Sequence, residues 1–193
     1  MKVTPPEHPA GNTLLVPSLD VGTPPNGKDT IAPRGADLFA RSRMRPAVPT
    51  LVLAQLVLAS FLCGLIWVVQ GVLYPLFGLV GSADFGAFHT AEMNRISWIV
   101  APVMSAELAL TVWVLVLAPR EPLAWAAAGL VALAWVSTGW LQVPLHQQLA
   151  AAGFDAERID RLTSTNWLRT AAWTVRVGLL IVWTRKLGRR ADR

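Results

Sequence analysis

Four long stretches of the chain contain almost no charged residues, and this pattern restricts the folds available to it. The first and third stretches have no Asp, Glu, Lys or Arg, the second has only Glu107, and the fourth has only Arg169 and Arg176. Each is longer than the roughly 20 residues that a helix needs to cross a bilayer. The sequence therefore predicts an all-α fold, an integral membrane four-helix bundle with up-down-up-down topology, whose spans fall within residues 46–83, 96–119, 122–154 and 162–184.

Charged residues make up only 15% of the sequence, whereas soluble globular domains average about 25%. The net charge of +5 does not indicate nucleic-acid binding, because the basic residues lie at the ends of the predicted helices, where lipid headgroups explain them. A single cysteine, Cys63, excludes an intrachain disulfide, a CxxC redox pair and a multi-thiolate metal site. The predicted partners are therefore the lipid bilayer and a lipophilic small molecule, and the sequence leaves a homo-oligomer open.

The chain divides into three parts by composition. Residues 1–46 are rich in proline and have no helical apolar period, so they are predicted to form a disordered cytoplasmic tail. Residues 47–185 form the predicted four-helix domain, and residues 186–193 a short basic cytoplasmic tail. The predicted helices cover about residues 49–77, 96–118, 123–146 and 166–183, and a separate short helix at the membrane interface is predicted over residues 155–162.

Basic residues are distributed unequally between the two sides of this arrangement. Counting from Arg34, ten lie on the side of the two termini, whereas three lie on the opposite side, namely Arg95, Arg158 and Arg161. Because positive loops stay in the cytoplasm, the sequence predicts a multi-pass protein of the cell membrane with cytoplasmic N- and C-termini. The tight turn at residues 119–122 then makes the second and third helices antiparallel.

The fourth predicted helix carries a polar stripe. Asn166, Arg169, Trp173 and Arg176 are spaced 3, 4 and 3 residues apart, which places them on one helix face. Helix rise places Arg176 and Glu107 near the middle of the bilayer, where an isolated charge costs about 2.5 kcal/mol or more. We therefore predict a structural ion pair between Glu107 and Arg176 that joins the second and fourth helices.

Polar residues from all four helices meet at the extracytoplasmic end of the predicted bundle. The candidate catalytic residues are those with titratable side chains, His89, His146 and Glu92. The candidate substrate-binding residues are Gln70, Tyr74, Gln142, Asn166, Arg169 and Trp173. Arg169 is suited to an anionic headgroup or a substrate carboxylate. Trp67, like Trp173, is predicted to face the interior of the bundle.

The histidines leave the cofactor undetermined. Two imidazoles and a carboxylate are compatible with iron, copper or zinc, and two histidines in a helical bundle are compatible with haem. The His89–Glu92 spacing, however, inverts the Glu-x-x-His order of ferritin-like di-iron helices. General acid–base use of one histidine, or plain hydrogen bonding, is equally compatible with the pattern.

Two short motifs carry a resemblance to a known family. The first predicted helix ends with Tyr74-Pro75, and the fourth opens with Asn-Trp-Leu-Arg-Thr at residues 166–170. In these motifs the segment from Pro49 to Trp183 resembles the anthrone oxygenase-like family of small four-helix membrane proteins. The resemblance implies a compact helical bundle, and some members of that family oxidise polycyclic aromatic polyketide intermediates. Only Asn166 and Arg169 carry over as motif positions, without assigned roles.

Three functions are compatible with this pattern. The first is a membrane enzyme, such as an oxygenase-like oxidoreductase, acting on a lipophilic small molecule held between the helices. The alternative is a non-enzymatic accessory or structural protein whose polar residues only specify helix packing. A transporter is the least favoured, because no inverted repeat and no Gly/Pro-broken helix pair is evident. A cavity faced by both histidines and Arg169 would favour the enzyme or a binding protein, and a filled core would favour the structural protein.

Overall fold

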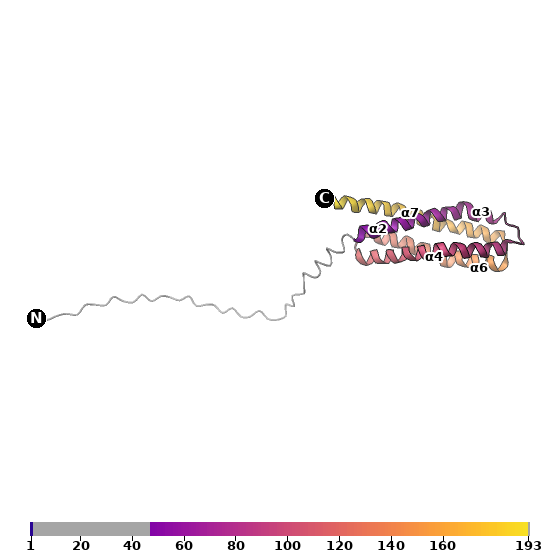
Figure 1. Ribbon diagram of the computed structural model, residues 1–193, viewed down its shortest axis with the longest axis horizontal. Coiled ribbons are helices and arrows are strands. Elements are labelled where there is room, and N and C mark those ends of the chain that lie inside the picture. Colours follow the sequence, from indigo (N-terminus) through magenta and orange to yellow (C-terminus); the bar gives the residue numbers. More distant parts are fainter. Residues whose placement is uncertain (2–46, 193) are drawn as a thin grey trace.

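Four helical rods pack side by side along their lengths in the computed structural model (Figure 1). The structure describes Met1 and residues 47–192, so residues 2–46 of the predicted tail lie outside the described residues. The helical segments are α2 (Ala47–Val68), η1 (Val69–Leu73), α3 (Tyr74–Phe77), α4 (Phe85–Leu117), α5 (Pro122–Ser137), η2 (Thr138–Gln142), α6 (Val143–Ala152) and α7 (Ala156–Ala191). The predicted all-α four-helix bundle is confirmed.

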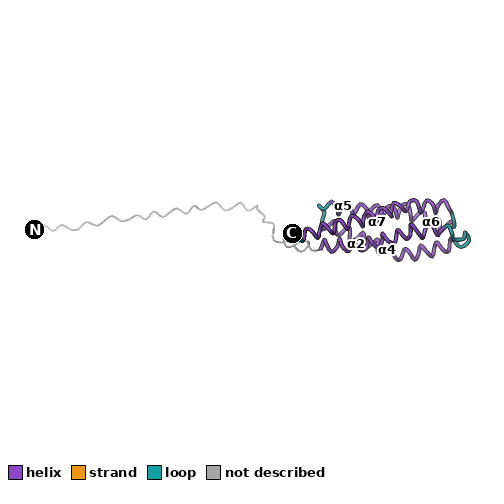
Figure 2. Tube along the Cα trace, turned by 90° about the horizontal axis from the view of Figure 1, so that it is seen from above, coloured by secondary structure: helices purple, strands orange, loops and turns teal. Residues whose placement is uncertain are grey.

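The rods α2–η1–α3 and α5–η2–α6 each pack against both α4 and α7 (Figure 2). The turn between α4 and α5 contains Glu121 and lies at the same end as the start of α2 and the end of α7. We call this the Glu121 end of the bundle. The loops that follow α3 and α6 lie at the opposite end, which we call the Phe85 end.

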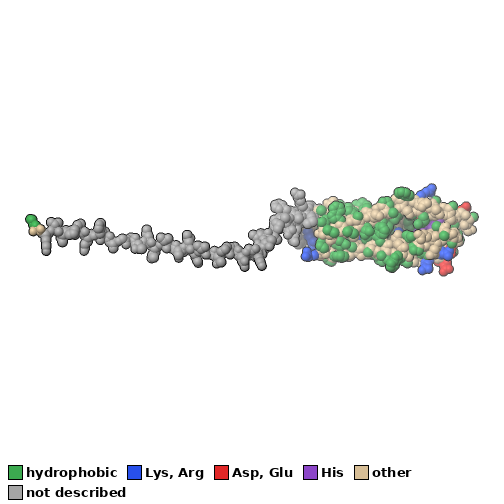
Figure 3. All heavy atoms as spheres, turned by 90° about the horizontal axis from the view of Figure 1, so that it is seen from below, with side chains coloured by type: hydrophobic (Ala, Val, Ile, Leu, Met, Phe, Trp, Pro, Cys, Tyr) green, Lys and Arg blue, Asp and Glu red, His purple; other side chains and the backbone are tan. Residues whose placement is uncertain are grey.

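Three of the rods are long and apolar enough to cross a membrane, namely Ala47–Phe77, Phe85–Leu117 and Pro122–Ala152. The fourth, α7, is equally long but carries Arg169 and Arg176, and both of these side chains are buried inside the bundle. Figure 3 shows hydrophobic side chains over the middle of the bundle and charged side chains gathered towards its two ends. The outer surface therefore suits a bilayer, and α7 turns its polar face inward.

The predicted break before the fourth helix is wrong. α7 runs without interruption through the predicted interfacial helix at residues 155–162 and well into the predicted basic tail at residues 186–193. Asp155 caps its start by accepting a hydrogen bond from the backbone N–H of Arg158 at 2.9 Å. The hydroxyl of Thr163 bonds a carbonyl four residues earlier in the same helix. These polar residues therefore stay inside the helix and do not end it.

Two rods contain a wider helical turn in corresponding positions. η1 and η2 are π-turns, and each ends two residues before a proline, Pro75 or Pro144. Proline has no backbone N–H, and its ring crowds the carbonyl four residues earlier. A wider turn relieves both problems, which explains why the turn precedes the proline in each rod.

The sequences around the two π-turns share a pattern. Residues 67–73 read WVVQGVL and residues 135–141 read WVSTGWL, with Trp, Val, Gly and Leu in the same places. Each rod nevertheless continues through its π-turn as one helix, Ala47–Phe77 or Pro122–Ala152, so the turn is a local widening and not a break. Single π-turns inside α-helices frequently lie at functional sites.

Glu121 ties the α4–α5 turn to the end of α7. Its Oε1 accepts a hydrogen bond from Lys186 Nζ at 2.8 Å, and its Oε2 lies 3.5 Å from Arg190 Nη1. The hydrogen bond from Lys186 lowers the pKa of the Glu121 carboxyl below its ordinary value of 4.5, and the nearby positive charges lower it further. The ionised form is therefore favoured in the folded protein.

Acidification is expected to remove the stabilisation that the ionised Glu121 carboxylate gives to the folded protein. Because the folded-state pKa is lowered, the contribution is complete above the ordinary value of 4.5 and is lost as pH falls through the lowered folded value. The partners Lys186 and Arg190 are 38% and 61% exposed, so the contribution is at most about 1 kcal/mol. Glu121→Gln should lower the thermal midpoint at neutral pH and flatten its acid dependence, whereas Glu157→Gln on the exposed start of α7 should do neither. Identical acid profiles for the wild type and Glu121→Gln would contradict this assignment.

Candidate functional site

Arg176 forms the predicted ion pair with Glu107 at the centre of the bundle. Its Nε donates to Glu107 Oε1 at 2.7 Å, and both side chains are 0% exposed. Nη2 also donates to Gln55 Oε1 and to Thr111 Oγ1, each at 2.9 Å, and Nη1 donates to the carbonyl of Ala127. Every nitrogen of this guanidinium therefore has an acceptor, and the acceptors come from the three other rods.

Gln55 and Thr111 were not predicted to take part in this network. Gln55 also donates from Nε2 to the carbonyl of Leu110 at 3.0 Å, so its amide joins α2 to α4. The available signal was that Gln55 and Gln70 are the two glutamines of the first apolar stretch. An amide in such a stretch has to find a partner inside the bundle.

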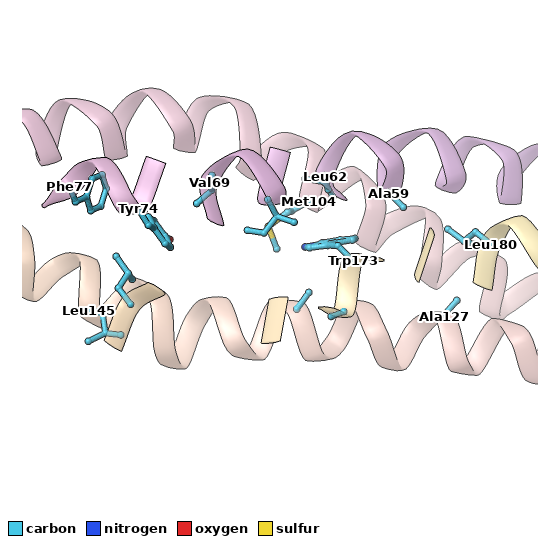
Figure 4. Packing of buried hydrophobic residues seen from close by; sticks show 14 of the residues in the cluster. Ala59, Leu62, Val69, Tyr74, Phe77, Met104, Ala127, Leu145, Trp173 and Leu180 are labelled. Carbon is cyan, nitrogen blue, oxygen red and sulfur yellow. The ribbon is translucent and has the colours of Figure 1, made fainter. Parts of the chain in front are cut away.

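A cavity of about 240 Å³ lies between this ion pair and the Phe85 end. Its walls are mostly apolar and include Leu62, Ile66, Val100, Met104, Trp135 and Trp173. Figure 4 shows Trp173, Met104 and Leu62 close together in the interior, with Val69 and Tyr74 further towards Phe77. Trp173 is buried, lines the cavity and lies three residues before Arg176 on α7.

The cavity also reaches the surface of the bundle. Three of its lining residues, Ser97 and Ala101 on α4 and Val143 on α6, are exposed. All three lie within helices that are long and apolar enough to cross a membrane. The mouth of the cavity therefore opens on the surface that suits lipid.

The polar end of the cavity is formed by Tyr74, Glu92, Gln142, His146 and Arg169. The Tyr74 hydroxyl donates to Gln142 Oε1 at 3.3 Å and lies 3.2 Å from His146 Nε2. His146 Nδ1 in turn lies 3.3 Å from His89 Nε2. A continuous chain of hydrogen bonds thus leads from the cavity through His146 to His89.

His89 is held in an aromatic cluster at the Phe85 end. Its ring stacks on Phe85 at a centroid distance of 5.4 Å and on His146 at 5.1 Å, and Phe77 meets it edge-on at 5.3 Å. His89 Nδ1 is buried and has no hydrogen-bond partner among the described residues. A proton on Nδ1 would therefore be a buried donor without an acceptor, which is costly.

This cost determines which ring nitrogens of His89 and His146 carry a proton. With His89 Nδ1 unprotonated, Nε2 carries the proton of the neutral ring and donates it to His146 Nδ1. His146 Nε2 then carries a proton and donates to the Tyr74 hydroxyl, which itself donates to Gln142. The assignment follows from the hydrogen-bond partners, and it leaves every N–H and O–H in the chain with an acceptor.

Two glutamine side chains fasten the π-turns to α7. Gln70, in η1, accepts from Asn166 Nδ2 at 2.8 Å and donates to the carbonyl of Thr163 at 3.2 Å. Gln142, in η2, donates to Thr165 Oγ1 at 3.0 Å. Gln70 and Asn166 lie behind the cavity wall, so their observed contacts are with the helices.

Arg169 differs from Arg176, which lies seven residues later on the same helix. Its side chain is buried, with 8% exposure, yet it forms no ion pair in the part of the chain that the structure describes. Nε has no hydrogen-bond partner there, although the guanidinium lies within reach of the Tyr74 hydroxyl. Glu92 also faces the cavity, and its buried Oε2 is likewise without a partner among the described residues.

The structure brings most of the predicted site residues to one place. The cavity is lined by Tyr74, Glu92, Gln142, His146, Arg169 and Trp173, and the residues buried directly behind it are Gln70, His89 and Asn166. Only one of the two histidines therefore faces the cavity. Within the described residues no group of three or more His, Cys, Asp or Glu side chains comes together, so the histidine pair has no third ligand for a metal.

The inward placement predicted for Trp67 is wrong. Its side chain is 47% exposed, and its Nε1 donates to Thr174 Oγ1 at 3.1 Å on the outer surface of α2 and α7. Its ring also meets that of Trp167 edge-on at 5.6 Å. Trp67 therefore belongs to the surface that suits lipid, and of the two tryptophans only Trp173 is buried.

No protein-family model, curated protein or solved structure matches the chain. The geometry of the cavity and of the charged groups around it is therefore what bears on function.

Proposed function

We propose that the chain is an integral membrane protein that binds a small lipophilic molecule between its helices. The observation that carries the proposal is the cavity, which has apolar walls, polar groups at one end and a mouth on the membrane-facing surface. Small-molecule sites typically combine a largely apolar pocket with a few convergent polar groups. A molecule dissolved in the bilayer would reach this cavity without crossing water.

The volume of the cavity limits the size of this molecule. An engineered protein cavity of about 150 Å³ takes up benzene. In proportion, about 240 Å³ accommodates about ten carbon atoms. A single short chain or a pair of fused rings has this size, whereas a whole phospholipid is far larger.

We place both termini in the cytoplasm. The support for this orientation is the cluster of basic residues at the Glu121 end, namely Arg185, Lys186, Arg189 and Arg190. The cavity would then lie in the outer half of the bilayer, with its polar end towards the extracytoplasmic surface.

Catalysis on the bound molecule is a second candidate function. The hydrogen-bonded chain from His89 through His146 to Tyr74 supports it, because a chain whose donors point towards Tyr74 can deliver a proton to a molecule in the cavity. The resemblance to the anthrone oxygenase-like family suggests oxidation of an aromatic molecule, and the indoles of Trp135 and Trp173 would suit flat rings. A purely structural role would explain the hydrogen bonds of Gln70 and Asn166, but not a buried Arg169 that has no counterion among the described residues.

Filling the cavity is expected to abolish binding. Val100 lines it from α4, so Val100→Trp should place an indole in the space that a ligand needs. Val116 lies on the same helix with 72% exposure and does not line the cavity, so Val116→Trp is the matched control. The measurement is saturable binding of radiolabelled decanol to the protein in lipid nanodiscs, with empty nanodiscs to subtract partitioning into lipid. If the wild type shows no saturable binding of any probe of this size, the proposed function is wrong.

A further inference from the structure

We infer that the cavity selects lipophilic anions, with Arg169 as the group that recognises the negative charge. The ligand class is a short-chain or bicyclic molecule of about ten carbon atoms that ends in a carboxylate or a comparable oxyanion. The inference rests on the proposed binding function and adds the chemistry of the ligand's polar group. Its evidence is the difference between the two buried arginines of α7.

Arg176 shows what a buried arginine in this bundle requires. It has acceptors at every nitrogen, including the carboxylate of Glu107. Arg169 is 8% exposed and has no carboxylate partner among the described residues. A buried charge without a partner is strongly unfavourable, so the burial of Arg169 indicates a partner that comes from outside the described residues.

Part of the Arg169 side chain lines the cavity. Arg169 lines the cavity together with Tyr74, Gln142 and His146, and its buried Nε lacks an acceptor among the described residues. Nε and one Nη form one edge of the guanidinium, and two parallel N–H groups on one edge match the two oxygens of a carboxylate. The Tyr74 proton is already donated to Gln142 Oε1, so the donors for the bound anion are the N–H groups of Arg169.

Glu92 is the only acidic residue among those that line the cavity. It makes no ion pair with Arg169 within 4.0 Å. An ionised Glu92 would repel an anionic ligand. Removal of its charge therefore provides a variant that should strengthen anion binding, whereas removal of the Arg169 charge should weaken it.

The test compares three probes with the same chain length and different headgroups. Decanoate, decanol and decyltrimethylammonium are offered to the nanodisc-embedded protein at alkaline pH, where the acid is ionised. The wild type is expected to bind decanoate more tightly than decanol by about tenfold to a hundredfold, the usual effect of a hydrogen-bonded charge pair. Arg169→Gln should remove this preference, Arg169→Lys should keep part of it, and Glu92→Gln should increase it.

The outcomes separate the inference from the proposed function. Equal binding of decanoate and decanol by the wild type would overturn the inference and leave the cavity as a neutral lipophilic site. If Arg169→Gln loses affinity for decanoate and for decanol to the same extent, the inference is also overturned, because Arg169 would then only shape the cavity. Saturable binding of none of the probes would overturn the proposed function itself. If Arg169→Gln does not fold, the wild type and Glu92→Gln still test the inference. A cationic site should bind decanoate more tightly than decyltrimethylammonium, so equal binding of the two probes would contradict it.

Discussion

Replacement of Arg176 with methionine is expected to destabilise the protein by about 3–5 kcal/mol, because it leaves the Glu107 carboxylate buried without its partner. Both side chains are 0% exposed, so water cannot take the place of the guanidinium. The same change removes the donors that bind Gln55 and Thr111. The measurement is the thermal midpoint in nanodiscs, with Arg185→Met at the exposed end of α7 as the matched control.

The double variant Glu107→Met/Arg176→Met distinguishes a lost pair from a lost side chain. Apolar residues of similar volume often replace a buried ion pair with little loss, so the double variant should recover most of the stability lost in Arg176→Met. If the double variant is less stable than the wild type by the sum of the two single effects, the two residues act independently. That additivity would contradict the ion pair as the main role of Arg176.

Phe77→Ala is expected to cost about 3–5 kcal/mol, as is usual when a fully buried aromatic ring is removed. Phe77 is 0% exposed, and its ring contacts those of Tyr74, Phe85 and His89. Its loss removes the edge-on support of His89 and leaves a void at the Phe85 end. Leu76→Ala, on the neighbouring residue with 46% exposure, is the control and should change the thermal midpoint little. Equal midpoints for the two variants would show that the aromatic cluster is not part of the stabilising core.

The sequence predicted the bundle because charge and length decide most of it. Stretches without charge mark the rods, and Pro119 with Pro122 marks the turn between α4 and α5. The continuity of α7 could not be predicted, because the Thr163–Thr165 segment resembles a loop in composition. In the folded chain its hydroxyls bond to carbonyls of the helix itself.

The rotation of the first rod was the main obstacle to predicting the site. The π-turn η1 takes up one additional residue, so the residue two turns before Tyr74 is Ile66 rather than Trp67. Ile66 is accordingly buried and lines the cavity, whereas Trp67 lies outside. A regular helical period cannot show this shift, although Pro75 is the residue that signals it.

The ion pair could be predicted, but the free arginine could not. Glu107 and Arg176 are the two isolated charges that helix rise brings to the same depth, so their pairing follows from topology. Whether Arg169 has a partner depends on the distance between side chains of different helices. The sequence indicated that Arg169 could bind an anionic group, and the structure adds that it lacks a carboxylate partner among the described residues.

Two arginines on one face of α7 therefore have different proposed roles. Arg176 stabilises the fold, and Arg169 binds the negative charge of a ligand in the cavity. Thermal unfolding of wild type, Arg169→Met and Arg176→Met in nanodiscs, each with and without decanoate, tests this difference most directly. We predict that Arg176→Met unfolds well below the wild type. Arg169→Met should unfold near the wild type, because it removes a buried charge that has no ion-pair partner within the part of the chain that the structure describes. Decanoate should raise the midpoint of the wild type but not that of Arg169→Met. Equal destabilisation by the two substitutions, with the same decanoate shift in wild type and Arg169→Met, would contradict the account.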